Sequence, residues 1–256
     1  MFFSKKFMIK KLINSFKRIL PYKIWIGLIS YYQMLKFFFL KKYTCRGSID
    51  KKLIDLIGRK KNGLFLEVGA YNGISESVSL RFEKELNWRG ILIEPNPLHF
   101  KYLKKNRRNN ICVNSLCLSK KYLNSELYIK NLNQMSYIVD KKNKFYFNQY
   151  PIQKINDLAR KSFSGDFMLY KCNVDTLENI FLINDIKKID LAIIDVEGSE
   201  IDLIEGINFE KVYIEYIGIE TYNFDKLNEL MKKKNFDFIK KLHYDDYLFV
   251  NKNEYK

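Results

Sequence analysis

The sequence predicts an α/β domain with a mainly parallel, twisted sheet, helices on both faces and an antiparallel closing strand. Two observations lead to this fold class. From about residue 48 onward, short apolar runs of strand length alternate with helical patterns. The first run, Leu64–Val68, leads into Gly69-Ala70-Tyr71-Asn72-Gly73, as expected for a buried strand that turns tightly into a helix. A chain of 256 residues can bury the core that this fold requires.

The positive charge of the chain is concentrated at its N-terminus. The formal net charge is +16, and residues 1–49 contain eleven Lys and Arg residues and no Asp or Glu. About +11 therefore lies in this segment, which leaves the rest of the chain near +5. We divide the chain into a basic, amphipathic and aromatic extension, residues 1–47, and a folded domain, residues 48–256. A compositional bias towards Lys, Asn, Ile, Phe and Tyr throughout the chain is a second explanation for part of the charge.

The extension predicts two helical segments. In residues 8–20 apolar side chains fall on one face and basic or polar ones on the other, and Pro21 ends the pattern, as in a helix that lies in a membrane interface. Residues 24–40 are mostly apolar but include Lys36 and are slightly short of the about 20 residues that span a bilayer, so we expect an interfacial segment. No signal-peptide cleavage pattern is evident. The alternatives are that the extension packs on the domain or binds an acidic polymer such as nucleic acid.

The remaining elements follow in order along the chain. We expect helices at residues 48–57, 75 or 76 to 86, 97–106, 176–183, 199–204 and 223–234. Strands are expected at residues 64–68, 91–93, 111–118, 126–129, 191–194 and 212–219, with a closing antiparallel pair at 236–242 and 247–250. Pro95 and Pro97 account for one boundary, because proline stops a strand and opens a helix. Residues 119–170 show one strand candidate only, and a loop of this length is usually functional or mobile.

The predicted ligand site lies at the carboxyl ends of the strands, where parallel sheets bind their ligands. The first turn lacks the phosphate-binding glycine motifs, and Glu67 at its entrance would repel a pyrophosphate. Glu94 ends the second strand, where an acid accepts hydrogen bonds from ribose hydroxyls. Together these residues indicate an adenosine that carries a positive sulfonium, which is S-adenosylmethionine.

Further acids follow the later strands. Asp195 and Glu197 come after the fourth strand and Glu220 after the fifth. Carboxylates at one rim raise one another's pKa, so they can act as a general base or hold a divalent cation such as Mg²⁺. The alternative is a solvated acidic loop or a helix cap. His243 precedes the last strand and is a further candidate for this rim, although a lone histidine is more often incidental.

The four cysteines show no CxxC pair and no histidine at ligand spacing. We therefore expect free thiols, a reducing compartment, no disulfide framework and no structural zinc. A cytoplasmic location, peripheral at the inner face of the membrane, agrees with the thiols and with the basic extension.

Six segments in order resemble the motifs of FkbM-type methyltransferases: FLEVGAYNG, NWRGILIEPNP, VNSLCLS, VDTLENI, IDLAIIDVEGSEIDLIEGINF and IGIETYN. The resemblance covers about residues 48–250. It implies a Rossmann-like S-adenosylmethionine-dependent fold and transfer of a methyl group to an oxygen, often a hydroxyl of a sugar or other metabolite. Carried over by position, Glu67, Gly69, Ala70 and Gly73 would line the methionine end of the cofactor. Glu94 would lie at the ribose and Asp195 near the transferred methyl, and Asn96 is a further predicted cofactor-binding residue.

Within this family reading, Asp195, Glu197 and Glu220 are the predicted catalytic residues. Residues 119–170 would shape the acceptor pocket, and five aromatic residues there could stack on sugar faces or simply pack: Tyr137, Phe145, Tyr146, Phe147 and Tyr150. Two other functions remain open at this stage. One is methylation of nucleic acid or protein, although the sequence shows no basic, aromatic groove that would favour it. The other is an inactive, membrane-bound scaffold.

Overall fold

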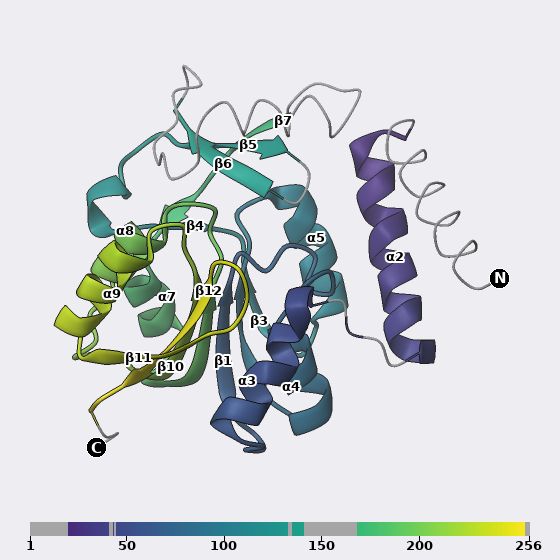
Figure 1. Ribbon diagram of the computed structural model, residues 1–256. Helices are drawn as coiled ribbons and strands as arrows, with labels where there is room; N and C mark the ends of the chain where they lie inside the picture. The colour runs from purple at the N-terminus through teal and green to yellow at the C-terminus, as the bar shows by residue number, and fades with distance from the viewer. Residues whose placement is uncertain (1–19, 41–42, 44, 133–134, 141–167, 254–256) are drawn as a thin grey trace.

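The computed structural model describes residues 20–40, 43, 45–132, 135–140 and 168–253. The helix expected at residues 8–20 and the aromatic residues expected to stack at positions 145–150 lie outside this part of the chain. The described residues form a central sheet with helices on both faces and small strands above one edge (Figure 1).

The central sheet has seven strands in the order β11-β12-β10-β9-β1-β2-β3. The bounds of its strands are β1 (Leu64–Val68), β2 (Arg89–Ile93), β3 (Ile111–Val113), β9 (Lys188–Ile194), β10 (Tyr213–Glu220), β11 (Phe236–Lys241) and β12 (Asp246–Asn251). The five strands from β3 to β10 pair in parallel, whereas β12 pairs antiparallel with both β10 and β11. The predicted parallel sheet and its antiparallel closing pair are thus confirmed.

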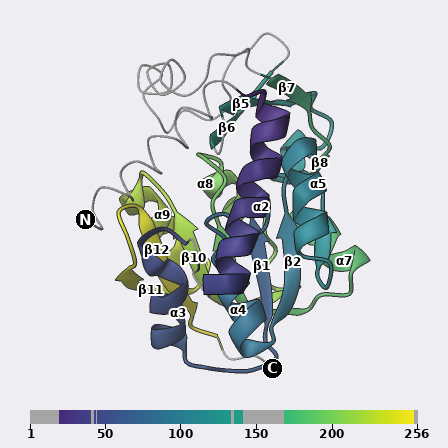
Figure 2. The same ribbon diagram turned by 90° about the vertical axis from the view of Figure 1, so that its right-hand side faces the viewer.

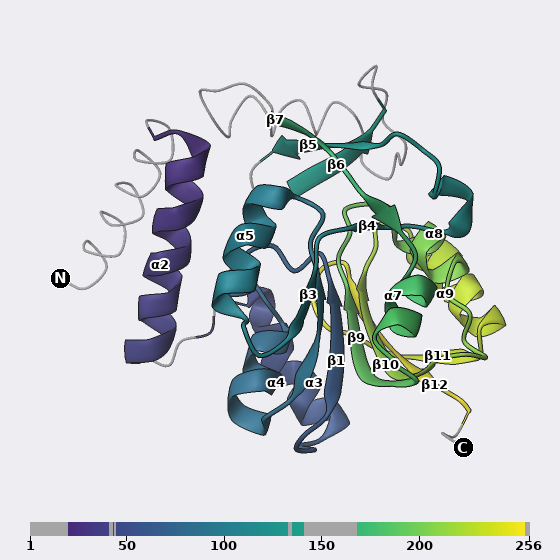
Figure 3. The same cartoon turned by 180° about the vertical axis from the view of Figure 1, so that it is seen from behind.

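Helices cover both faces of the sheet because each turns an apolar stripe towards it. On one face lie α3 (Ile49–Ile57), α4 (Ser79–Leu86) and α5 (Pro97–Asn106), whose buried side chains include Leu53, Phe82 and Leu103. On the other lie α7 (Leu177–Ile183), α8 (Glu200–Glu205) and α9 (Phe224–Lys233), which bury Phe181 and Met231 among others (Figure 3). The single turn η1 (Arg46–Ser48) leads into α3.

The strand predicted at residues 111–118 is wrong, because it divides into β3 and β4 (Leu116–Cys117), which belong to different sheets. The break lies at Asn114, whose side chain donates to the carbonyls of Glu94 and Pro95 at 2.8 and 3.1 Å. Beyond it, β4 pairs in parallel with β8 (Val174–Asp175). Tertiary contacts of one polar side chain thus interrupt a strand pattern that is apolar on both sides of it.

Residues 119–171 contain more structure than the sequence indicated. After the turn η2 (Lys120–Tyr122), the strands β5 (Tyr128–Leu132), β6 (Met135–Val139) and β7 (Met168–Lys171) form a three-stranded antiparallel sheet. Figure 1 shows this small sheet above the edge at which the parallel strands end. A ligand bound at that edge would therefore lie beneath the small sheet.

The helix expected from residue 75 or 76 begins only at Ser79. The preceding amides bond to side chains instead of to a helix: Asn72 Oδ1 accepts from Ile74 and Ser75 at 3.0 and 2.8 Å, and Glu67 accepts from Val78 at 2.9 Å. These acceptors hold residues 74–78 in a turn.

Helix α2 (Tyr22–Leu40) packs beside α5 and against the turn after β1 (Figure 2). Ile26 and Phe37 are buried on the side that faces the domain. Among the residues that the structure describes, no helix is long and apolar enough to cross a membrane.

Candidate active site

The turn after β1 brings the ends of three strands together. The amides of Gly69 and Ala70 both donate to the carbonyl of Ile93, at the end of β2, at 3.0 Å. Gly69 has a φ of 88°, and a Cβ there would lie 1.8 Å from the backbone oxygen of Asp195, at the end of β9. Only glycine tolerates this conformation and this contact, so Gly69 permits the close approach of β1 and β9.

Glu94 is fixed by the backbone at the end of β2. Its Oε2 accepts from the amide of Tyr71 and its Oε1 from the amide of Asn96, both at 2.8 Å. His99 Nδ1 lies 3.5 Å from Oε1. Each carboxylate oxygen accepts about two hydrogen bonds, so both still have lone pairs for a ligand. The arrangement suits a pair of neighbouring ligand hydroxyls.

A cavity, which we call the β2 cavity, lies between the ends of β1, β2 and β9 and the small sheet above them. Polar lining comes from Glu94, Asp195 and Glu197, whereas Leu116 and Ile138 contribute to an apolar wall. A ligand that has a flat apolar part, hydroxyls and a positive charge matches this lining.

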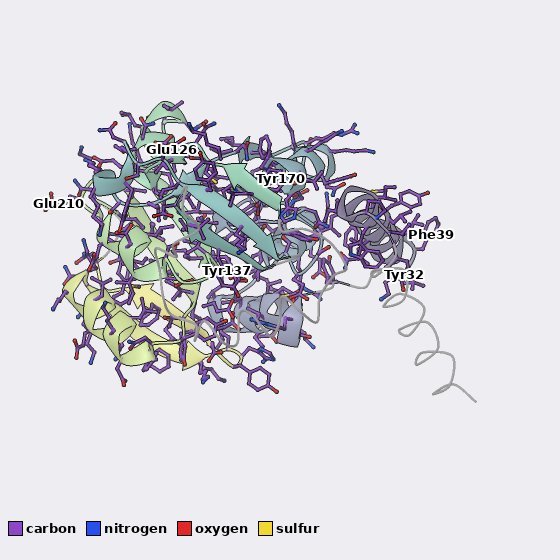
Figure 4. All side chains as sticks on the ribbon, turned by 90° about the horizontal axis from the view of Figure 1, so that it is seen from above. Tyr32, Phe39, Glu126, Tyr137, Tyr170 and Glu210 are labelled. Carbon is purple, nitrogen blue, oxygen red and sulfur yellow. The ribbon has the colours of Figure 1, made fainter. Side chains whose placement is uncertain are left out.

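The small sheet closes the β2 cavity from above. Ser136 and Ile138 of β6 line it, and Tyr137 between them is buried and does not, because successive side chains of a strand point to opposite faces. Figure 4 labels Tyr137 and Tyr170 in this sheet and Glu126 just before it. Tyr137, predicted as a possible sugar-stacking residue, thus packs within the protein.

Glu67 does not line the β2 cavity. Its carboxylate accepts from the Ser77 hydroxyl at 2.9 Å, from the Val78 amide at 2.9 Å and from the Ser79 hydroxyl at 2.5 Å. These contacts order the turn that leads into α4. The methionine-end contact expected from the sequence stays a prediction.

The same turn is held by a buried guanidinium. Arg107, whose side chain is 0% exposed, donates to Glu83 at 2.5 Å, to the Gly73 carbonyl at 3.0 Å and to the Ser77 hydroxyl at 3.0 Å. A Cβ on Gly73 would lie 2.6 Å from Arg107 Cγ. Gly73 therefore makes room for the arginine, and it does not line the β2 cavity.

A second cavity, the β10 cavity, lies at the ends of β9 and β10 beside the start of α3. Glu76, Asp195, Glu220 and Asp246 line it together with Arg46. Arg46 Nη2 donates to Glu220 Oε1 at 2.8 Å and lies 3.8 Å from Asp246 Oδ2. Asp195 lines both cavities, so the two meet at this residue.

The acids near this junction bind protons unusually well. Asp195 is exposed to solvent, but the protein atoms near its carboxyl reduce its solvation, and this effect and the charges of Glu220 and Glu197 raise its pKa above the usual range. Burial, followed by the charge of Glu220, raises the pKa of Glu197 to about 8. Burial raises the pKa of Glu200 to about 7 and that of Asp246 to about 6. The cluster can therefore exchange protons near neutral pH.

Three other predictions from the sequence concern a bound Mg²⁺, His243 and Asn96. Among the described residues, no group of three or more His, Cys, Asp or Glu side chains is placed to hold a metal ion, so the structure gives no support for Mg²⁺. His243 packs against Gly47, and its Nδ1 lies 3.8 Å from Asp246 Oδ2, behind the β10 cavity. Asn96 caps α5 through its side chain, which accepts from the Leu98 amide at 2.9 Å, and only its backbone amide meets Glu94.

Models of known protein families identify the family of this chain. Residues 67–238 match the model of the methyltransferase FkbM domain. The chain belongs to this family. It is accordingly an S-adenosylmethionine-dependent methyltransferase with a Rossmann-like α/β fold, as the sequence motifs predicted.

Solved structures of methyltransferases are similar at a lower level. An Aquifex aeolicus S-adenosylmethionine-dependent methyltransferase has 10% identity and a TM-score of 0.38, over 78% of this chain and 86% of that one. A putative ribosomal RNA methyltransferase from Plasmodium falciparum has 15% identity and a TM-score of 0.40, over 82% and 97%. At these values the likenesses carry no argument about activity. The comparison with curated proteins gave no match.

Sequence reasoning missed several lining residues of this FkbM methyltransferase. Tyr71 and His99 line the β2 cavity with their rings 4.4 Å apart, and Tyr71 lies inside the glycine turn, which was a usable signal. Arg46 and Asp246 line the β10 cavity. No local pattern could have revealed them, because Arg46 meets Glu220 across 174 positions of the chain.

We expect the methyltransferase without cofactor to be less stable at pH 8 than at pH 5. In the unfolded chain Glu197 titrates near 4.5, but in the folded protein its pKa is about 8. Between these values the folded state binds more protons, so the free energy of unfolding falls as pH rises, by at most about 1.4 kcal/mol per pH unit for one group. Urea unfolding at several pH values measures this slope. Glu197→Gln should flatten it, and equal stability at pH 5 and 8 would contradict the prediction.

Proposed function

We propose that this protein is an O-methyltransferase that transfers the methyl group of S-adenosylmethionine to a hydroxyl of a sugar, glycan or related metabolite, at or near a membrane surface. The observation that carries the proposal is the meeting of two cavities at Asp195. One has an acid placed for hydroxyls of a ribose, and the other is lined by acids with raised pKa values, among them Asp195 and Asp246, the latter with a pKa of about 6.

The residues of the β2 cavity fit the cofactor. Glu94, with lone pairs left on both oxygens, would hold the ribose hydroxyls, and the apolar wall at Leu116 and Ile138 would hold the adenine. Asp195 and Glu197 would lie towards the positive sulfur, where an anion is favourable. When bound, S-adenosylmethionine supplies a methyl group on a positively charged sulfur.

The acids of the cluster suit a hydroxyl acceptor. A sugar hydroxyl is a poor nucleophile at neutral pH until a base removes its proton. A carboxylate whose pKa is raised towards neutrality is a stronger base than an ordinary one, and Asp195 and Glu197 are such groups. One of these carboxylates would take the proton of the acceptor hydroxyl, and the bound cofactor would supply the methyl group to that oxygen and leave as S-adenosylhomocysteine. The cavity walls would also align the acceptor oxygen with the methyl carbon, which increases the rate of transfer further.

A sugar is the acceptor class that the β10 cavity favours. Its lining offers several carboxylate acceptors and the donor Arg46 within one cavity. A molecule with many hydroxyls can satisfy such a lining, because each hydroxyl both donates and accepts. An apolar acceptor would leave the hydrogen-bonding capacity that remains beside the Arg46–Glu220 pair unused, which costs about 1–3 kcal/mol for each polar group left unsatisfied.

The cofactor contact is tested by calorimetric titration of S-adenosylmethionine into the full chain. We expect Glu94→Gln to weaken binding about 100-fold, because two hydrogen bonds to a charged acceptor are weakened. Glu210→Gln, an exposed acid far from both cavities (Figure 4), is the matched control and should bind like the wild type. Equal binding by Glu94→Gln would overturn the ribose contact. A folded wild type that binds no cofactor would favour the scaffold alternative.

The acceptor class is tested separately with labelled cofactor and a panel of sugars, sugar nucleotides and lipid-linked sugars. The expected product carries the new methyl group on oxygen, identified by mass spectrometry of the hydrolysed sugar. Methyl groups found only on nitrogen, or only on RNA or protein offered in parallel, would contradict the proposal.

A further inference from the structure

Helix α2 has an apolar face that the described part of the domain leaves exposed. At 100° per residue, Ile24, Leu28, Tyr31, Leu35 and Phe39 fall within an arc of about 80°. Four of them are exposed by 52%, 51%, 58% and 79%, in the order Ile24, Leu28, Tyr31 and Phe39. We call these five residues the outer face of α2. Figure 4 shows Phe39 at the margin of the molecule, on the side away from the sheet.

The opposite side of α2 is attached to the turn after β1. Asn72 Nδ2 donates to Ser30 Oγ at 2.7 Å, and the Ser75 hydroxyl donates to Gln33 Oε1. Asn72 is 0% exposed and lies between the two glycines of that turn. Phe37 adds an apolar contact with Ile74 and Leu80. The helix is therefore a fixed part of the domain, and its outer face has a defined position relative to the β2 cavity.

Charge selects the partner of this face. Residues 1–49, which contain α2, carry eleven Lys and Arg residues and no acid. Lys36 borders the outer face, with its Nζ 5.2 Å from the centre of the Tyr32 ring. Apolar and aromatic side chains flanked by cations are typical of a helix that lies in the interface of an anionic membrane. A second protein chain would need an apolar surface with acids placed around it, whereas an anionic bilayer offers apolar acyl chains and negative headgroups together.

We propose that the outer face of α2 docks the protein on an anionic lipid bilayer, with the helix lying along the surface. Ile24, Leu28, Tyr31 and Phe39 enter the boundary between headgroups and acyl chains, and the lysines contact the anionic headgroups. Since α2 is bonded to the turn after β1, docking holds the cavities at a fixed distance from the surface. This inference goes beyond the proposed reaction and does not depend on it.

The test is co-sedimentation of the full chain with vesicles of phosphatidylcholine that contain about 30% phosphatidylglycerol, beside vesicles of phosphatidylcholine alone. We expect binding to the first kind only, weakened at high salt. The double variant Leu28→Glu/Phe39→Glu should bind at least about tenfold less. The matched control is Leu182→Glu/Ile183→Glu, which changes two apolar residues on α7, exposed by 78% and 72%, by the same chemistry. It should bind like the wild type.

Several results would overturn the proposal. One is a wild type that does not sediment with anionic vesicles, or that sediments equally with neutral ones. Another is a Leu28→Glu/Phe39→Glu variant that binds as well as its control. A third is a lower melting temperature of this variant without lipid, which would mean that another part of the chain covers the face. Loss of a dimer in size-exclusion chromatography would assign the face to a second copy. Cofactor titration of both variants keeps this test separate from that of the reaction.

Discussion

Replacement of Asp195 by Asn is expected to lower kcat about 10²–10⁴-fold, the usual contribution of a general base. Asparagine keeps the shape of the side chain but cannot take a proton. Asp195 stands where the two cavities meet, and its surroundings raise its pKa well above the usual range. Cofactor affinity should fall less than kcat, since the ribose contact at Glu94 remains and only one of the two anions towards the sulfur is lost.

The measurement is methyl transfer at saturating cofactor, with calorimetry on the same preparations. In the wild type, kcat should rise with pH as the acids of the cluster ionise, because the ionised form is the base. The pKa of about 8 for Glu197 places part of this rise between pH 7 and 8. Asp185→Asn, in the exposed loop before β9, is the matched control and should keep full activity. Full turnover by Asp195→Asn would remove this residue from catalysis.

Arg107→Met should destabilise the fold by about 3–5 kcal/mol, the cost of breaking a buried ion pair on one side. The guanidinium is 0% exposed and lies 2.5 Å from Glu83 and 4.0 Å from Glu67. Burial acts to raise the pKa of Glu83, but the charges of Arg107 and Lys84 outweigh it and hold this pKa below its usual value. Without Arg107 both carboxylates stay buried with their main cation gone.

Urea unfolding followed by the fluorescence of the buried Trp88 gives the free energy of unfolding. The deficit of the variant should be largest above about pH 5, where Glu83 is ionised, and should shrink in acid as this carboxyl is protonated in both proteins. Arg108→Met is the neighbouring control, because Arg108 is exposed and bonds only locally, to the Lys105 carbonyl at 3.1 Å. A difference below about 1 kcal/mol between the two variants would refute the structural role of Arg107.

The elements predicted best are those with local signals at their ends. Helix α5 spans the predicted residues 97–106, because Pro97 suits the first turn and Asn96 accepts from the amides of that turn. Helix α7 begins after Thr176, which caps it by accepting from the Asn179 amide at 3.1 Å. These signals act within a few residues, so the sequence alone contains them. The family motifs and the positions of Glu94 and Asp195 at strand ends are readable for the same reason.

The tertiary structure decided what depends on distant partners. Glu67 and Asp195 both belong to the end of a strand, yet only Asp195 lines the cavities, because Glu67 meets Arg107 and the hydroxyls of the next turn. Arg46 enters the acidic cluster from 174 positions away. Sequence by itself therefore determined the fold class, the family and the acids that could form a site. The packing of the sheet decides which carboxylates face a ligand and which bond within the protein. The reason is that the interaction of two charges depends on their distance in space and not on their separation along the chain.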